Sequence, residues 1–384
     1  MQSVKRRSWR KKPGKTSGTW AVWGLIAFLA LSAGYGSRDR DNRAQDAKRA
    51  MFQKQRFLVF NPMLERRIEC TDEILEGKLL KVTGKDKGDM FLSDLWDCRK
   101  LSLQRVIYKY PDVAYASGKP IRDISCLRGL RNLRSLNLDE NLISDIRPLS
   151  SLIHLKYLWL AHNPIQDLSP LKSLTQLYHL NLNAAHVGDA DLELLSGLKN
   201  LGMLELDRNG IESLEALRGM NVSRLTLNQN QISDISPLTD LGRSLCWLEL
   251  NENQLTDIGP LAECGRLWEL SLRHNRITDI GPLKNLDRVS YLWLSDNAIA
   301  TLPDLSGMTA LVQLDLSDNH ITTEEWKKAR LPEGIFEVYL SGNPITDFEP
   351  APGNPDFNIV FNGNTFNTGI FKNRKGGNET EDGG

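Results

Sequence analysis

Leucine, isoleucine and asparagine recur along most of the chain at spacings that fit neither one continuous helix nor one continuous strand. In residues 155–171 (LKYLWLAHNPIQDLSPL) the leucines and the isoleucine fall at successive intervals of 3, 2, 5, 3 and 3. Residues 289–305 (VSYLWLSDNAIATLPDL) repeat the YLWL and asparagine positions. A helix requires a period near 3.6, and a half-buried strand alternates with a period of 2. The pattern therefore predicts a short unit that is repeated rather than a single long element.

The units align on the motif LxxLxLxxNxI, in which the asparagine position recurs every 21 to 24 residues. Nine of ten such positions are asparagine and the tenth is Ala185. The asparagines are Asn141, Asn163, Asn209, Asn230, Asn253, Asn275, Asn297, Asn319 and Asn343. We expect each asparagine to turn inward at a bend and to hydrogen-bond backbone groups that the bend leaves unpaired. Stacked units would then form an asparagine ladder, altered at Ala185.

Each unit predicts a short strand around LxL, followed by a turn and an extended or 3₁₀ return. A single unit cannot close its apolar face, so its leucines become buried only when neighbouring units stack on it. Prolines at the return positions prevent a continuous helix there. The two longest units lack this proline, and residues 188–198 (GDADLELLSGL) and 322–334 (TTEEWKKARLPEG) each predict a short helix, the second with Thr322 and Glu325 as a capping box.

These units resemble leucine-rich repeats of the 22-residue bacterial type, because tails such as ISDIRPL, IQDLSPL and ITDIGPL follow the asparagines. The resemblance covers roughly residues 111–365 and is closest to internalins and to the SDS22-type phosphatase regulators. It implies an α/β-type solenoid, in which a curved stack carries a parallel sheet on its concave face. The convex side should be mostly irregular or 3₁₀ with few short helices. For internalin-like proteins the resemblance also implies non-catalytic recognition of a protein partner.

The segments outside the repeats predict an exported protein with capped ends. We expect a basic region and apolar signal or anchor at 1–36, a charged linker at 37–57, an N-terminal cap at 58–110, repeats at 111–343, a C-terminal cap at 344–371 and a disordered tail at 372–384. Residues 16–37 (TSGTWAVWGLIAFLALSAGYGS) carry no charge and follow a basic stretch, as in export signals. Two outcomes remain open: cleavage near Gly34, giving a secreted or periplasmic protein, or retention as a single-pass anchor. Membrane contact is expected only through residues 20–36.

The charge distribution argues against nucleic acid as a partner. Residues 1–38 contain eight basic and no acidic residues, so the remainder carries 40 basic and 48 acidic residues. A net negative surface repels phosphate backbones.

The cysteines and the missing sequence motifs limit which disulfide, metal, cofactor and catalytic sites the chain can have. Five cysteines in an exported chain favour one disulfide, for which Cys70 and Cys98 are the predicted pair. We expect no metal site and no cofactor, because neither CxxC nor HExxH spacing occurs. Phosphate-binding and nucleophile motifs are also missing, so no catalytic residue is predicted.

Alternate residues of each strand should project from the concave face. Trp and Tyr are the residue types enriched at binding hot spots. The candidate partner-binding residues on this face are Tyr157, Trp159, His179, Glu205, Trp247, Glu249, Tyr291, Trp293 and Tyr339. Tyr115 would extend this face, whereas Trp268 stands one place before a strand and is expected to pack beside it. The alternatives to a protein partner are an envelope glycan stacked on the aromatic rings or an SDS22-like intracellular scaffold.

Overall fold

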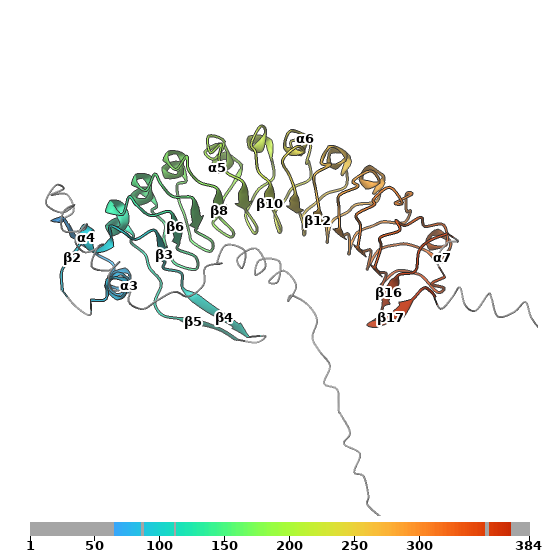
Figure 1. Cartoon of the computed structure of the whole chain (residues 1–384), viewed down its shortest axis with the longest axis horizontal. Coiled ribbons are helices and arrows are strands. Elements are labelled where there is room, and N and C mark those ends of the chain that lie inside the picture. The colour runs from blue at the N-terminus through green and yellow to red at the C-terminus, as the bar shows by residue number, and fades with distance from the viewer. Residues whose placement is uncertain (1–64, 86–87, 111–112, 350–352, 370–384) are drawn as a thin grey trace, which may run out of the picture. The chain divides into compact units, whose positions relative to one another are not determined.

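The computed structural model describes residues 65–85, 88–110, 113–349 and 353–369. Within these residues, one sheet of 13 strands extends from β3 through β6 to β17 in sequence order. Neighbouring strands from β3 to β16 are parallel, and β17 alone is antiparallel to its neighbour. Figure 1 shows the strands on the inner side of a curved stack and the helical turns on the outer side. The predicted leucine-rich-repeat solenoid is therefore confirmed.

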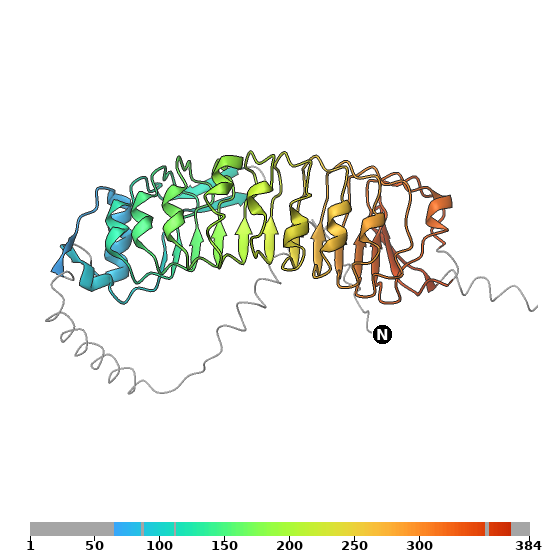
Figure 2. The same cartoon turned by 90° about the horizontal axis from the view of Figure 1, so that it is seen from above.

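The strands of this sheet are short and lie side by side along the stack (Figure 2). They are β3 (Lys100–Ser102), β6 (Ser135–Asn137), β7 (Tyr157–Trp159), β8 (His179–Asn181), β9 (Met203–Glu205), β10 (Arg224–Thr226), β11 (Trp247–Glu249), β12 (Glu269–Ser271), β13 (Tyr291–Trp293), β14 (Gln313–Asp315), β15 (Glu337–Tyr339), β16 (Asn358–Phe361) and β17 (Asn364–Asn367).

The core is a continuous column of leucine and isoleucine side chains shared between neighbouring units. Leu158, Leu160, Leu292 and Leu294 are fully buried, as the repeat pattern predicts. The residue between the two leucines of each strand points the other way because successive side chains of a strand alternate. The interior is thus built by stacking, and the alternate positions are left for the concave face.

The nine asparagines form one repeated hydrogen-bond arrangement at the turn that follows each strand. The Asn253 amide Nδ2–H donates to carbonyls of its own unit and to Leu227 O of the preceding unit, at 2.9 to 3.2 Å. Its Oδ1 accepts the Ile232 N–H of the preceding unit at 3.1 Å. The residue before each asparagine has a positive φ, for example 55° at Glu252, which makes the bend tight. Each side chain thus joins two units through their backbones.

The unit at Ala185 departs from this arrangement. Alanine offers no acceptor for Ile165 N–H, which instead donates to Asn163 O two residues earlier at 2.9 Å. Pro164 lies between these residues, and its fixed φ suits such a tight turn. A local turn therefore satisfies the donor that the ladder would otherwise satisfy.

The convex side consists of short 3₁₀ helices and three short α-helices. The 3₁₀ helices are η2 (Ser125–Gly129), η3 (Arg147–Ser151), η4 (Ser169–Ser173), η5 (Glu215–Leu217), η6 (Gly259–Glu263) and η7 (Gly281–Leu283). Proline occupies the first turn of η3, η4, η6 and η7, where its missing N–H costs nothing. The α-helices are α5 (Asp189–Glu193), α6 (Leu238–Leu241) and α7 (Thr323–Trp326).

Two of these helices occur in the units where the sequence predicts them, and α6 is an additional one. Thr322 caps α7, since its hydroxyl accepts the Glu325 N–H. The predicted reciprocal bond is not made, because Glu325 Oε1 accepts the Leu302 N–H of the preceding unit at 2.9 Å. The capping box thus becomes a link between units.

The N-terminal elements continue the same core. They are β1 (Arg67–Ile68), α3 (Glu73–Thr83), β2 (Met90–Phe91) and α4 (Leu92–Leu95). Leu75 and Leu79 on α3 are fully buried in the shared core. The helix begins at Asp72, whose side chain accepts the Ile74 and Leu75 N–H groups, and ends at Gly84 with φ of 72°.

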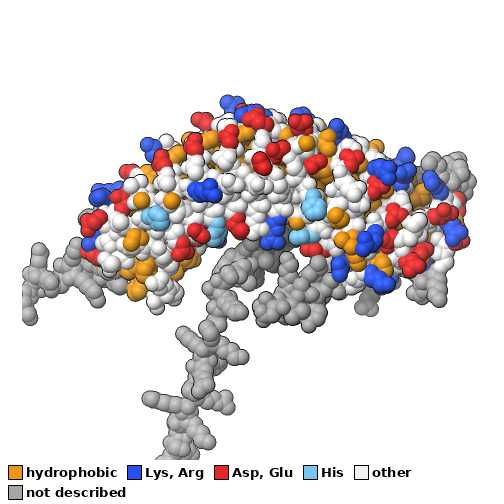
Figure 3. Space-filling model, turned by 180° about the vertical axis from the view of Figure 1, so that it is seen from behind, with side chains coloured by type: hydrophobic (Ala, Val, Ile, Leu, Met, Phe, Trp, Pro, Cys, Tyr) orange, Lys and Arg blue, Asp and Glu red, His pale blue; other side chains and the backbone are white. Residues whose placement is uncertain are grey.

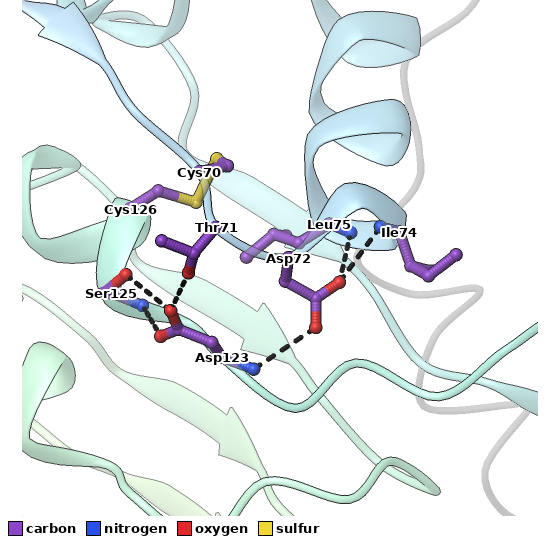
Figure 4. Close-up of a disulfide and its surroundings, with 8 residues drawn as sticks. All are labelled: Cys70, Thr71, Asp72, Ile74, Leu75, Asp123, Ser125 and Cys126. Carbon is purple, nitrogen blue, oxygen red and sulfur yellow. Dashed lines mark hydrogen bonds between the residues drawn. A yellow bond between two sulfur atoms is a disulfide. The ribbon is translucent and has the colours of Figure 1, made fainter.

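The predicted Cys70–Cys98 disulfide is wrong, because Cys70 bonds to Cys126 in η2 (Figure 4). The Cα atoms of this pair are 5.0 Å apart. The Asp72 side chain also accepts the Arg122 N–H at 2.7 Å, so the segment before α3 lies against the loop that leads into η2. Cys98 is a free, half-buried thiol.

Strand β3 is followed by a hairpin inserted before the next turn of the array. β4 (Val106–Tyr110) and β5 (Val113–Ser117) pair only with each other, in an antiparallel sheet. Tyr115 therefore does not extend the concave sheet as expected, and β3 supplies the strand next to β6 instead.

At the other end, β16 and β17 close the sheet and aromatic side chains cover the last repeat. The Phe348 ring lies 4.6 Å from Phe361 and 6.1 Å from Phe366, between ring centroids. Trp326 of α7 packs edge-on against Phe357, and both side chains are buried. The predicted segments 1–36, 37–57 and 372–384 lie outside the described residues. None of the helices in the described part is both long and apolar enough to cross a membrane.

Candidate recognition surface

In-register pairing of the strands aligns their outward residues in rows across the concave face. Tyr157, for example, lies beside His179 of the next strand, and Trp159 lies beside Asn181. We use "concave face" for the first and third residues of β6 to β15 and for the residue two positions after the third. Seven side chains on this face are acidic and two are basic. They are Asp139, Glu205, Asp207, Glu249, Glu269, Asp315 and Glu337, with Arg224 and Arg273.

One group of aromatic rings lies on β7 and β8, and we call it the N-terminal aromatic cluster (Tyr157, Trp159, Tyr178, His179). The Tyr157 and Trp159 rings are stacked, with centroids 6.3 Å apart and an interplanar angle of 14°. Tyr178 meets Tyr157 edge-on at 6.2 Å, and His179 meets Trp159 edge-on at 5.0 Å. The exposed fractions of Tyr157 and Tyr178 are 39% and 43%, so much of this cluster faces solvent.

His179 connects this cluster to the acidic middle of the face. Its Nε2 lies 2.7 Å from Glu205 Oε1, and Asn181 Nδ2 donates to Glu205 Oε2 at 2.8 Å. His179 is only 8% exposed, so its ring is held within the surface of the sheet. The Glu205 carboxylate is thereby fixed in one orientation by two side chains of the neighbouring strand β8.

A second group of rings lies on β11 to β13, and we call it the C-terminal aromatic cluster (Trp247, Trp268, Tyr291, Trp293). Tyr291 and Trp293 are stacked at 5.8 Å with an angle of 12°. Trp268 meets Trp247 edge-on at 5.0 Å and Tyr291 edge-on at 6.4 Å. Trp268 is 40% exposed, so it belongs to the open surface as well as packing beside the strand.

Two arginines lie against the tryptophans of this cluster. The guanidinium carbon of Arg224 is 4.0 Å from the Trp247 ring centroid, and that of Arg273 is 5.4 Å from the Trp293 ring. Arg273 also forms a 3.2 Å ion pair with Asp315. The Nε atoms of both arginines are buried without a hydrogen-bond partner. The positive charge on this face is therefore held against aromatic rings.

Carboxylates surround the C-terminal aromatic cluster. Glu249 accepts the Trp247 Nε1–H at 2.7 Å and the Asn228 Nδ2–H at 2.8 Å. Burial and then the nearby charge of Glu249 raise the pKa of Glu269 to about 8, although Arg224 acts in the opposite direction. At neutral pH, Glu269 is therefore mostly protonated.

Two further carboxyl groups lie at the edge of the face near the turns. Burial raises the pKa of Asp139 to about 6, against the N–H bond that it accepts from Ala161. Burial also raises the pKa of Asp207 to about 6, against the N–H bond from Asn228. Both groups therefore change charge just below neutral pH.

Tyr339 lies apart from both clusters. Its hydroxyl donates to Glu337 Oε2 at 2.6 Å and accepts the Gln313 Nε2–H at 2.9 Å. Burial and the Glu337 carboxylate raise the pKa of Tyr339 to about 12. The polar end of this side chain is thus already occupied within the chain.

The structure brings the predicted candidates together in two groups, and it adds residues that the sequence did not select. Tyr178 and Trp268 belong to the two clusters because each immediately precedes a strand, at the rim of the sheet. An aromatic residue directly before the xLx triplet is the signal that could have identified them. Within the described residues, no group of three His, Cys, Asp or Glu side chains is arranged to hold a metal ion.

Comparisons with known proteins agree with this architecture. The leucine rich repeat family matches residues 265–321, and the family of leucine rich repeats in two copies matches residues 153–190. A search of curated proteins gave no significant match.

Solved structures give broader matches. An internalin (inlF) from Listeria monocytogenes is 28% identical with a TM-score of 0.60, over 76% of this chain and 95% of that one. Internalin C2 of the same organism is 30% identical with a TM-score of 0.52, over 58% of this chain and 93% of that one. The ectodomain of the receptor kinase GASSHO1/SCHENGEN3 from Arabidopsis thaliana, in complex with CASPARIAN STRIP INTEGRITY FACTOR 2, is 22% identical with a TM-score of 0.52, over 69% of this chain and 33% of that one. That last likeness is one of fold alone.

Proposed function

The chain belongs to the leucine-rich-repeat family and is similar to internalins, and we propose that it binds a protein partner on its concave face without catalysing a reaction. The observation that carries this proposal is the pair of aromatic clusters. Tyr157, Tyr178, Trp268 and Tyr291 are each more than a third exposed, on a face whose leucines are already buried in the core. Large aromatic side chains in contact with water add little to folding, whereas they supply much of the affinity of protein interfaces.

We also propose that the protein functions outside the cytoplasm. The basic and apolar N-terminal sequence has the order of an export signal. The Cys70–Cys126 disulfide supports the same proposal, because structural disulfides persist in oxidising compartments. An SDS22-like scaffold inside the cell would need neither feature. Cell fractionation that finds the protein in the cytosol with reduced thiols would contradict this part of the proposal.

A glycan is the second candidate ligand, because the stacked Tyr157–Trp159 and Tyr291–Trp293 pairs could each hold a sugar ring. The net negative charge of the concave face favours a protein with basic side chains over a neutral sugar. Screening the full chain on a glycan array and against envelope proteins separates the two.

The direct test compares partner crosslinking by the full chain with that of a Trp159→Ala/Trp293→Ala double variant. The double variant should lose the crosslinked partner while its circular dichroism remains unchanged. A Val82→Ala/Ile153→Ala variant removes exposed apolar surface away from the concave face and serves as the matched control. Undiminished crosslinking by the tryptophan variant, or equal loss in the control, would contradict recognition by the concave face.

A further inference from the structure

The two aromatic clusters have the same construction. Each has a tyrosine and a tryptophan from one YLW strand, stacked within 15° of parallel (14° and 12°). In each, a ring from the rim position meets the tyrosine edge-on, at 73° for Tyr178 and 76° for Trp268. The rim ring comes from the following unit in the N-terminal aromatic cluster and from the preceding unit in the C-terminal aromatic cluster. One surface therefore carries two similar places for an apolar side chain.

The parallel register sets the distance between these places. Tyr157 and Trp159 are on β7, and Tyr291 and Trp293 occupy the corresponding positions six strands later on β13. At about 4.8 Å per strand, the clusters are about 29 Å apart. An extended polypeptide advances about 3.3 Å per residue, so about nine residues bridge this distance.

The surface between the clusters is acidic. Glu205, Asp207 and Glu249 lie on the intervening strands and the turn beside them, opposed by Arg224. The Arg224 guanidinium already lies over the Trp247 ring, and Glu205 and Glu249 are oriented by side-chain amides of neighbouring strands. Preoriented carboxylates in a half-buried surface attract ammonium and guanidinium groups.

We infer that the concave face accepts one extended protein segment with two aromatic anchors about nine residues apart and Lys or Arg between them. Each anchor packs on one aromatic cluster, and the basic side chains contact Glu205, Asp207 and Glu249. This inference rests on the proposed function and specifies its partner. It also explains why the tyrosine–tryptophan pair is present twice rather than once.

Synthetic peptides test this inference with the full chain. The principal probe has tryptophan at both ends and about eight alternating lysine and serine residues between them. Matched probes replace either tryptophan with alanine, replace every lysine with glutamate, or halve the spacer. Calorimetry or fluorescence anisotropy should show the principal probe binding at least about tenfold more tightly than either single-tryptophan probe, because the second contact becomes intramolecular. Affinity should fall with added salt and below about pH 6, as Asp207 is protonated.

Variants of the chain locate the anchors. Trp159→Ala and Trp293→Ala should each lower the affinity for the principal probe to that of a single-tryptophan probe. The affinity for the single-tryptophan probes should change by no more than about twofold. If the alanine variant folds poorly, Trp159→Leu replaces it, because leucine keeps apolar volume without an aromatic ring. As a control, Val82→Ala should not change the affinity for any probe.

Each other outcome has a distinct meaning. Equal affinity for one-anchor and two-anchor probes, or loss in only one tryptophan variant, overturns the two-anchor arrangement and leaves concave-face recognition intact. Equal binding of the glutamate probe overturns the basic segment. No binding of any probe overturns the whole inference, while crosslinking to an envelope partner that depends on Trp159 and Trp293 would still support the proposed function.

Discussion

Replacing Asn253 with alanine tests how the ladder stabilises the stack. The Asn253 amide donates to the carbonyls of Leu227, Leu250 and Asn251 at 2.9, 3.1 and 3.2 Å. Its Oδ1 accepts the Ile232 N–H at 3.1 Å. Alanine removes all four bonds at once in the middle of the array.

The four losses are unequal, because the carbonyls have other donors. Leu227 O still accepts from Asn230 Nδ2, and Leu250 O still accepts from Asn275 Nδ2. Asn251 O likewise keeps the Gln229 N–H. Only Ile232 N–H loses its sole partner, and a buried unpaired donor costs about 1–3 kcal/mol. Adding the weaker loss at the shared carbonyls, we expect unfolding free energy to fall by about 2–3 kcal/mol.

Ala185 provides an internal comparison, because there the chain satisfies the equivalent donor, Ile165 N–H, with Asn163 O. The segment 230–232 has glutamine where Pro164 stands, so its backbone is not held in that turn. In the Asn253→Ala variant the Ile232 N–H should therefore stay unpaired, whereas the Ile165 N–H in the unit before Ala185 is paired.

Urea unfolding followed by circular dichroism gives the free energy, and hydrogen exchange at the Ile232 amide gives the local effect. Gln254→Ala is the matched control, because this exposed neighbour should change stability by less than about 0.5 kcal/mol. If Asn253→Ala is as stable as this control and the Ile232 amide stays protected, the ladder is not the source of the stability assigned to it.

Three further perturbations have defined outcomes. A Cys70→Ser/Cys126→Ser variant opens a loop with a sequence separation of 56 residues. Urea titration should show the free energy of unfolding fall by about 4 kcal/mol. Cys98→Ser should change this free energy little, and equal effects of the two variants would contradict the observed pairing. Glu269 has its pKa raised from 4.5 to about 8, so the folded state binds the extra proton and stability should fall as pH rises through that interval, by up to about 1.4 kcal/mol per pH unit. Glu269→Gln should flatten that part of the urea-midpoint profile, and an unchanged slope would exclude this carboxyl as its cause. Leu206→Ala, in the shared interior, should cost about 2–5 kcal/mol by the same assay, and a loss below about 1 kcal/mol would contradict its burial in a tightly packed core.

The repeat fold was predictable because its determinants are local and recur. Each LxL triplet fixes which side chains face inward, and so the burial of Leu158 follows from sequence spacing alone. The helices α5 and α7 follow from the two longest units, in which extra residues replace the short return. The whole array then follows from stacking equivalent units one after another.

The remainder depends on contacts between segments that differ from the repeat. The strands of the β4–β5 hairpin, VIYKY and VAYAS, are rich in β-branched and aromatic residues and carry no turn signal that separates them from the array. The partner of Cys70 depends on contacts between the segment before α3 and the loop that leads into η2, such as the bond from Arg122 N–H to Asp72. These contacts join segments about 50 residues apart in the sequence, so no local pattern predicts them. Trp268 was assigned to packing because it stands one place before a strand. Its 40% exposure and its edge-on contact with Tyr291 depend on the neighbouring unit, which the position alone does not reveal.

The strict register of the parallel sheet makes the distance between the two aromatic clusters an adjustable, stepwise quantity. Duplication or deletion of one unit between β8 and β11 would move the clusters apart or together by about 4.8 Å without altering the residues within either. In evolution, such a change would alter the preferred length of a bound chain in fixed steps of one strand spacing. A family of related proteins could thereby acquire new partners through unequal recombination, with the residues of both aromatic clusters retained.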